Sequence, residues 1–196
     1  MSRPLDAAAL DQLFRTARTY NAFLDTPVTR EQMDAIWELM KFGPTSANCL
    51  PARIVWCASD EAKQKLAAMA LPANGEKIRS APVTAIIGMD LEFYENLPEL
   101  FPHTDARSWF VGNPVLAEAT AFRNSSLQGA YFILAARAVG LDTGPMSGFS
   151  NEAVDAAFFP RGKVKSNFIC TVGHGDPASI FERSPRPSFD RFNSVV

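Results

Sequence analysis

Apolar residues recur at helical spacing in five segments of this chain. Spacings of three and four residues place apolar side chains on one face of a helix. They predict helices over residues 5–18, 29–42, 59–71, 114–140 and 150–158. The second helix has the clearest ends, because Thr29 and Gln32 form a capping-box pattern and Gly43 is expected to end the helix in the left-handed conformation.

Shorter runs of apolar and β-branched residues predict strands. These runs cover residues 53–58, 82–89 and 167–172. Runs of this kind are typical of strands buried inside a domain. Because no internal repeat and no linker divides the sequence, we expect residues 1–196 to form a single domain.

Two further segments show no clear period. Residues 90–113 are rich in aromatic side chains, and a long segment of this kind in a compact domain is usually a lid or a binding loop. We therefore predict that residues 90–113 cover a functional site. Residues 175–196 are rich in proline and arginine, which predicts an extended tail that must dock on something to be ordered. The predicted helix over 114–140 is apolar or small on several faces, as in helices that lie in a core or pack against another subunit.

The composition favours a folded domain and argues against several classes of partner. The 196 residues are 47% hydrophobic and 20% charged, so the chain has enough apolar surface to offset the entropy lost on ordering. The 19 Lys and Arg residues balance 21 Asp and Glu residues without a basic run, so nucleic acid is not an expected partner. The 3 cysteines lack Cys-x-x-Cys spacing, and no apolar run is long enough to span a membrane, so we expect a cytoplasmic protein without a membrane segment.

The usual signatures of nucleotide-binding and hydrolytic enzymes are absent from the sequence. There is no Gly-x-Gly-x-x-Gly or Gly-x-x-x-x-Gly-Lys motif, and Ser147 lacks the flanking glycines of a nucleophile elbow. His103 and His174 are the only histidines, so we expect no metal site.

Three loops instead combine residues that suit a bound cofactor. Residues 15–21 place two arginines and several hydroxyls beside a helix end, and guanidinium groups suit phosphate oxygens. Residues 43–53 offer hydroxyl and amide groups to a planar heterocycle, and the glycines of residues 140–149 let backbone amides approach a ligand. Each loop alone could be an ordinary turn or a solvated helix end. Together they suggest that a bound cofactor carries the chemistry.

In order and approximate spacing, the three loops resemble those of the nitroreductase family of FMN flavoproteins. The resemblance covers nearly the whole chain, with specific runs such as Phe-Arg-Asn-Ser-Ser and Gly-Pro-Met-Ser-Gly-Phe. Within the family, the chain is most similar to the malonic semialdehyde reductases of pyrimidine degradation, also described as 3-hydroxypropanoate dehydrogenases. The segments that carry this similarity are residues 43–54, 103–110, 121–131 and 140–149.

The resemblance implies a fold, an assembly and a reaction. The expected fold is α+β, with a central, mainly antiparallel sheet flanked by helices, and two chains form an intertwined homodimer with FMN in its interface sites. The expected reaction passes a hydride from NADPH or NADH to the flavin, and then from the flavin to malonic semialdehyde. A broad-specificity nitro or quinone reductase is the alternative function. A non-catalytic flavin-binding domain is the alternative from another class of protein.

The FMN-binding residues that the resemblance implies form three groups and one position in the tail. They are Arg18, Thr19 and Asn21; Pro44, Thr45, Ser46 and Asn48; Pro145, Met146, Ser147 and Gly148; and Arg186, with Arg183 as a weaker candidate. The first group and the tail arginine would contact the phosphate, ribityl chain and pyrimidine edge. The second would contact the flavin ring and the substrate side, and the third would present backbone amides to the flavin N5 region.

Two positions depart from the family pattern. Asn21 stands where many relatives carry a basic residue, which would stabilise the anionic reduced flavin. The chain therefore needs that charge from elsewhere, or its flavin has a lower potential. Leu50-Pro51-Ala52 stands where many relatives have Gln-Pro-Trp, which argues against broad nitroaromatic specificity.

The aromatic segment also contains candidate substrate-binding residues. Malonic semialdehyde carries a carboxylate, and a pocket selective for it needs a cation close to the flavin. Arg107 is the candidate for this cation, and His103 is a candidate proton donor. The alternative is that Arg107 pairs with Asp105 or another surface acid.

Overall fold

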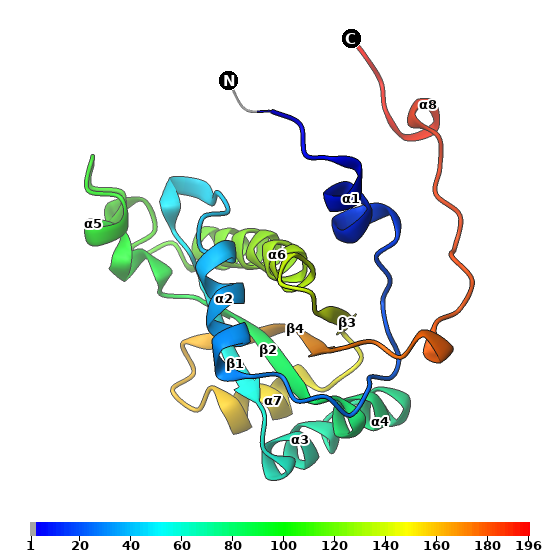
Figure 1. The fold of residues 1–196 in the computed structure, drawn as a ribbon. Helices are drawn as coiled ribbons and strands as arrows, with labels where there is room; N and C mark the ends of the chain where they lie inside the picture. The colour runs from blue at the N-terminus through cyan, green and yellow to red at the C-terminus, as the bar shows by residue number, and fades with distance from the viewer. Residues whose placement is uncertain (1–2) are drawn as a thin grey trace.

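The protein is built on a four-stranded antiparallel sheet with strand order β1-β2-β4-β3, as the computed structural model shows for residues 3–196 (Figure 1). The strands are β1 (Ala52–Cys57), β2 (Val83–Asp90), β3 (Asp142–Met146) and β4 (Val164–Gly173). All three strand pairs are antiparallel. The α+β fold with a central antiparallel sheet, which the resemblance implies, is confirmed. The homodimer stays a prediction.

Helices cover both faces of this sheet (Figure 1). Their bounds are α1 (Ala7–Leu10), α2 (Arg30–Met40), α3 (Asp60–Ala67), α4 (Pro72–Ser80), α5 (Leu97–Leu100), α6 (Pro114–Ala138), α7 (Asn151–Phe158) and α8 (Phe189–Phe192). Because side chains alternate along a strand, Ala85 and Ile87 of β2 face the core beneath α2 and α6, whereas Ile86 faces the core formed with α3, α4 and α7.

The first predicted helix is shorter than expected and buries its apolar face only in part: Leu10, Leu13 and Ala17 are half-buried. Helix α1 covers Ala7–Leu10 and continues as a π-helical turn over Asp11–Arg15, so residues 5–18 are only partly helical. Phe14, on the predicted apolar face, is 54% exposed. The segment packs against the end of α6, where Gln12 donates to the Arg137 carbonyl at 2.6 Å and Arg137 donates to the Leu13 carbonyl at 2.8 Å.

Helix α2 begins as predicted but ends for a different reason. The Thr29 side chain accepts from the Gln32 amide at 3.3 Å, and the Gln32 side chain accepts from the Thr29 amide at 2.9 Å. The expectation of a left-handed Gly43 is wrong, because Gly43 is not among the glycines with positive φ. A Cβ at Gly43 would instead lie 2.0 Å from the ring of Tyr131, so a glycine is required here for close packing.

Strand β3 corrects the expectation that residues 140–149 form a loop. Asp142–Met146 pairs with β4 at the edge of the sheet. Pro145 is compatible with this position, because an edge strand does not need every N–H for pairing. A Cβ at Gly144 would lie 2.4 Å from the Thr171 hydroxyl, so a glycine at this position lets β3 and the Thr171 side chain of β4 approach closely.

Other differences concern element bounds. The predicted helix over 59–71 ends at Ala67, and the next helix, α4, is not predicted by apolar spacing. Helix α4 begins with Pro72 in its first turn and contains Gly75, so its sequence lacks an ordinary helical pattern. Strand β4 covers Val164–Gly173 and is longer than the predicted 167–172.

Residues 90–113 are folded onto the body of the protein. They contain a 3₁₀ turn at Phe93–Asn96, helix α5 and a second 3₁₀ turn at Arg107–Trp109. Phe93, Leu97 and Phe110 are buried in a small core that includes Ala117 and Ala121 of α6. The segment therefore has a packed base, and its role as a cover stays a prediction.

The last residues run along the outside of the molecule. From Phe181 onward the side chains are exposed, and the chain continues past the short helix α8 away from the sheet (Figure 1). The assignment of residues 175–196 as an extended tail that docks on something stays a prediction. Within residues 3–196, no helix has the length and apolar character needed to cross a membrane.

Candidate functional site

A cavity of about 350 Å³ brings arginines from three parts of the chain together. Arg18 comes from the segment after the first helix, Arg137 from the last turn of α6, and Arg183 and Arg186 from the tail. Thr19 also lines the cavity. The structure therefore unites the arginines predicted at opposite ends of the sequence and adds Arg137, which the sequence analysis did not identify.

Hydrogen bonds join the two chain ends at this cavity. Arg183 donates to the carbonyls of Arg15 and Ala17, each at 2.9 Å. Arg18 in turn donates to the carbonyl of Phe181. The tail is therefore held where the predicted phosphate-binding residues meet.

The arginine cavity has an excess of positive charge. Within residues 3–196, no carboxylate lies within 4.0 Å of a guanidinium nitrogen of its four arginines, although Glu182 also lines the cavity. Burial lowers the pKa of Arg137, and the charge of Arg183 lowers it further, whereas Asp142 and Cys170 act in the opposite direction. An anion in the cavity would relieve this repulsion, and guanidinium groups match the oxygens of a phosphate.

Asn21 contacts the tail. Its side-chain amide donates to the Ser179 carbonyl at 3.0 Å, and the Ala22 amide donates to the Ser179 hydroxyl at 3.1 Å. Asn21 is not among the residues that line the arginine cavity. In this structure it fastens the N-terminal segment to the start of the tail.

The second predicted group lies in a loop with unusual backbone conformations. Ala47, Asn48 and Leu50 have φ values of 48°, 49° and 37°, and they are the only non-glycine residues with positive φ in the described chain, residues 3–196. Such conformations cost roughly 1–3 kcal/mol each and cluster at ligand sites. The loop that carries Thr45 and Ser46 is therefore held in place by its surroundings.

Polar side chains of α6 provide part of this support. Asn124 accepts from the Ser46 amide at 2.8 Å, and Tyr131 donates to the Pro44 carbonyl at 2.9 Å. Asn124 belongs to the Phe-Arg-Asn-Ser-Ser run, whose role the sequence alone did not show. The sequence does show an asparagine within an apolar helix. Such a residue could have been predicted to bond another segment, because a polar side chain buried in a helix interface needs a partner.

The third predicted group follows strand β3. The Gly148 carbonyl accepts from the Leu71 amide at 3.0 Å and from the Asn74 side chain at 3.1 Å, so this turn is anchored to the start of α4. The backbone amides of Ser147 and Gly148 have no hydrogen-bond partner within residues 3–196. They are thus free to donate to a ligand, and their contact with FMN stays a prediction. Pro145 and Met146 form the end of β3 just before them.

One protomer brings only some of these groups together. Thr19 forms a bridge with Thr143, so the first group lies beside the strand that leads to the third. Ser46 of the second group is bonded to Asn124 in the middle of α6, whereas Arg137 lies in the last turn of the same helix. At 1.5 Å per residue, these two positions are about 20 Å apart along the axis of α6. Ser46 is therefore distant from the arginine cavity, whereas Pro44, bonded to Tyr131, is about 9 Å from Arg137 along the same axis.

Arg107 and His103 lie in the aromatic segment. The Arg107 Nε and Nη2 atoms donate to Glu95 at 2.7 and 2.8 Å, so its partner is Glu95 and not the neighbouring Asp105. Hydrogen bonding from Arg107 holds the pKa of Glu95 below its usual range. His103 is exposed, and its ring meets the Phe101 ring edge to face, with the two ring centroids 5.4 Å apart.

The chain is similar to known proteins over most of its length. The model of the nitroreductase family matches residues 14–174. A Polynucleobacter asymbioticus protein with the provisional name NADH dehydrogenase/NAD(P)H nitroreductase is 58% identical over 190 residues, 97% of each chain. A protein of the same provisional name from Stenotrophomonas maltophilia is 60% identical, also over 97% of each chain.

A solved structure shows the same fold. It is a provisionally named nitroreductase from Exiguobacterium sibiricum, in complex with FMN, with a TM-score of 0.85 and 19% sequence identity. The match covers 100% of this chain and 99% of that chain.

Proposed function

This chain belongs to the nitroreductase family, and on that premise we propose that it is an FMN-dependent NAD(P)H oxidoreductase. The arginine cavity is the observation that carries the proposal. Four guanidinium groups, none of which has a carboxylate of residues 3–196 within 4.0 Å, form a site for a phosphate, which is the charged end of FMN. The solved relative with the same fold binds FMN.

The residues of this chain would divide the work of holding FMN. Arg18, Arg137, Arg183 and Arg186 would bind the phosphate, and the amides of residues 147–148 would face the ring. Bound FMN supplies the hydride-transfer chemistry between NADH or NADPH and the acceptor. The chain therefore needs no side-chain nucleophile, and its task is to bind, orient and shield.

A second copy of the chain would complete each site. The second group is Pro44, Thr45, Ser46 and Asn48, and it would contact the FMN of the partner protomer. Its Ser46 is bonded to Asn124, about 20 Å along α6 from Arg137. The exposed apolar side chains of α6 support this assembly. They include Val115, which is 78% exposed, and Phe122, which is 55% exposed.

Malonic semialdehyde is the acceptor that we propose. Arg107 lies in the aromatic segment and would bind the substrate carboxylate, with His103 as a candidate proton donor. The Nη1 atom of Arg107 has no protein partner within residues 3–196 and would provide this contact.

A broad nitro or quinone reductase is the second candidate. One observation favours it: Glu95 already occupies two nitrogens of Arg107 and neutralises its charge. An uncharged acceptor would need no cation at this position. The two candidates share the flavin and differ in the acceptor.

A binding titration tests the phosphate site directly. Flavin-free protein is titrated with FMN and with riboflavin, which has the same ring and no phosphate, while flavin fluorescence is followed. We expect FMN to bind about 100-fold or more tightly than riboflavin, because several charge-assisted hydrogen bonds are lost with the phosphate. Equal affinities, or no binding of either flavin, would refute the proposed site.

A further inference from the structure

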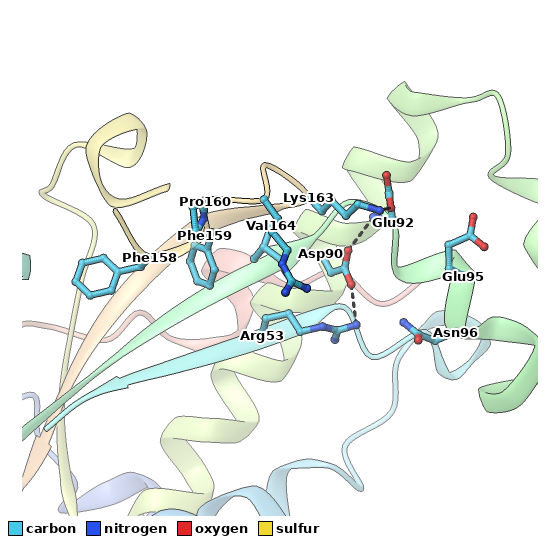
Figure 2. A pocket seen from close by; sticks show the side chains of 11 residues that line it. Arg53, Asp90, Glu92, Glu95, Asn96, Phe158, Phe159, Pro160, Lys163 and Val164 are labelled. Atoms are coloured by element: carbon cyan, nitrogen blue, oxygen red, sulfur yellow. Dashed lines mark hydrogen bonds and ion pairs between the residues drawn. The ribbon is translucent and has the colours of Figure 1, made fainter. Parts of the chain in front are cut away.

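A second cavity, of about 510 Å³, lies between the ends of β1 and β2 and the turn after α7 (Figure 2). It contains none of the residues assigned above to FMN. Figure 2 shows Arg53 of β1 and Asp90 at the end of β2 pointing toward each other in this cavity. Their Nη2 and Oδ2 atoms are 2.7 Å apart.

Arg53 is also bonded to the loop that precedes its own strand. Its Nη1 atom donates to the Leu50 carbonyl at 3.0 Å and to the Ala52 carbonyl at 2.9 Å. One guanidinium group therefore connects Asp90 to the end of the loop that carries the second FMN group. The fork of a guanidinium can make these bonds together, whereas a lysine has a single nitrogen.

Asp90 is itself fixed in place. Its backbone amide donates to the Pro51 carbonyl at 2.8 Å, and its Oδ1 atom accepts from the Glu92 amide at 2.9 Å. The Asp90 side chain is only 14% exposed. Asp90 thus offers Arg53 a rigid partner at the start of the aromatic segment.

The loop needs such support because its backbone is strained. Leu50, whose carbonyl Arg53 binds, is the last of the three residues with left-handed φ. Its amide also donates to the Thr45 hydroxyl at 3.3 Å, so the position of Leu50 affects Thr45 directly. Strained conformations persist only where surrounding contacts determine them.

We propose that Arg53, held by Asp90, is a positioning residue that fixes the left-handed backbone of residues 47–50 and thereby orients Thr45, Ser46 and Asn48 toward the flavin. The inference rests on the proposed FMN-dependent function. It assigns Arg53 no contact with the flavin. Its effect passes through the carbonyl of Leu50 to the residues of the loop.

The same cavity provides a matched control residue. Arg161 lines it, but within residues 3–196 Arg161 has no carboxylate within 4.0 Å and no hydrogen bond to the loop. Replacing Arg161 by methionine removes a positive charge from the cavity and leaves the bonds of Arg53 intact. An effect of Arg53 that Arg161 does not share is therefore due to the loop contacts.

The first test follows hydrogen exchange of the amides in residues 45–50 by mass spectrometry on the full-length protein. Arg53→Met should raise their exchange rate by about tenfold or more, the ratio expected for losing a charge-assisted hydrogen bond. Arg53→Lys should give an intermediate rate, and Arg161→Met should match the wild type. Unchanged exchange in Arg53→Met, or an equal rise in Arg161→Met, would overturn the proposal.

The second test compares the flavin-loaded variants. We expect Arg53→Met to shift the flavin reduction potential and to lower kcat about tenfold for transfer to the acceptor, the ratio expected for loss of one such bond. Partial recovery is expected in Arg53→Lys. A purely structural role would lower thermal stability and leave the potential unchanged, which would also overturn the proposal.

The outcomes separate this inference from the proposed function. If wild-type protein binds no flavin, the proposed function fails. Hydrogen exchange then still tests whether Arg53 holds the backbone of residues 47–50. If Arg53→Met does not fold, Asp90→Asn provides the second variant, because it keeps the side-chain shape and removes the charge that holds Arg53. Wild-type exchange at residues 45–50 in Asp90→Asn would then count against the role of the pair.

Discussion

At the scale of single residues, the arginine cavity makes the sharpest prediction. Arg18→Ala and Arg186→Ala should each weaken FMN binding about 10- to 100-fold, since each removes a charge-assisted contact worth about 1.5–3 kcal/mol. Arg191→Ala is the matched control, because Arg191 is a tail arginine that packs on Phe192 and lies outside the cavity. Fluorescence titration with FMN measures all three affinities. Wild-type affinity for FMN in both cavity variants would exclude the arginine cavity as the phosphate site.

Arg107 carries the prediction about the acceptor. If Arg107 binds the carboxylate of malonic semialdehyde, Arg107→Met should lower kcat/KM for that aldehyde by about 10- to 100-fold, the effect of losing a charged hydrogen bond. Flavin reduction by NADPH and turnover of an uncharged quinone should remain nearly unchanged. Steady-state kinetics with the two acceptors provides the comparison. Equal losses with both would assign Arg107 and its Glu95 partner to structure and favour the broad reductase.

The sequence reveals some of these residues and hides others. Arg18 and Arg186 can be predicted because they stand at motif positions of a recognisable family. Arg137 cannot be predicted in this way. An arginine in the last turn of a helix is common, because its positive charge interacts favourably with the helix dipole, so it does not by itself indicate a binding site. Likewise, the bond from Arg53 to Leu50 depends on a loop conformation that no residue pattern indicates.

At the scale of elements, the packing of α6 on the sheet and its helix propensity predict opposite changes in stability for one substitution. A Cβ at Gly129 would lie 2.3 Å from the ring of Phe168, so Gly129→Ala should destabilise the protein by about 1–3 kcal/mol. Helix propensity alone predicts the opposite, a gain of about 1 kcal/mol.

Urea unfolding of the Gly129 variant distinguishes these two effects. Glu118→Gln, an exposed substitution on the same helix, serves as the control and should change stability by less than about 0.5 kcal/mol. A stabilised Gly129→Ala protein would show that α6 is not pressed against β4 at this point.

The same contrast explains which elements the sequence predicts. Helix α2 is predictable because its periodicity and its capping box are local. Strand β3 is not, because Gly144 and Pro145 resemble a loop until the strand beside them is known. In α4, Gly75 is buried against the Ala67 carbonyl, a tertiary contact that a local pattern does not contain.

At the scale of the whole molecule, the distribution of the FMN residues predicts a dimer. The loop with Ser46 and the cavity with Arg137 lie about 20 Å apart along α6, and the resemblance places FMN between two chains, so we predict that the loop of one chain completes the FMN site of the other. Exposed apolar side chains on α6 and in the tail would be covered by the partner. Light scattering should report two chains per particle. A monomer that carries a full complement of flavin would contradict this assembly.

The central claim is that this chain transfers hydride from NAD(P)H to an acceptor through bound FMN. Anaerobic titration of the FMN-loaded protein, followed by its visible absorption, tests it most directly. We predict that NADPH or NADH bleaches the flavin band completely, and that malonic semialdehyde or a quinone restores it without oxygen. A protein that gains no flavin band from FMN, or whose band neither nicotinamide cofactor changes, would contradict the account.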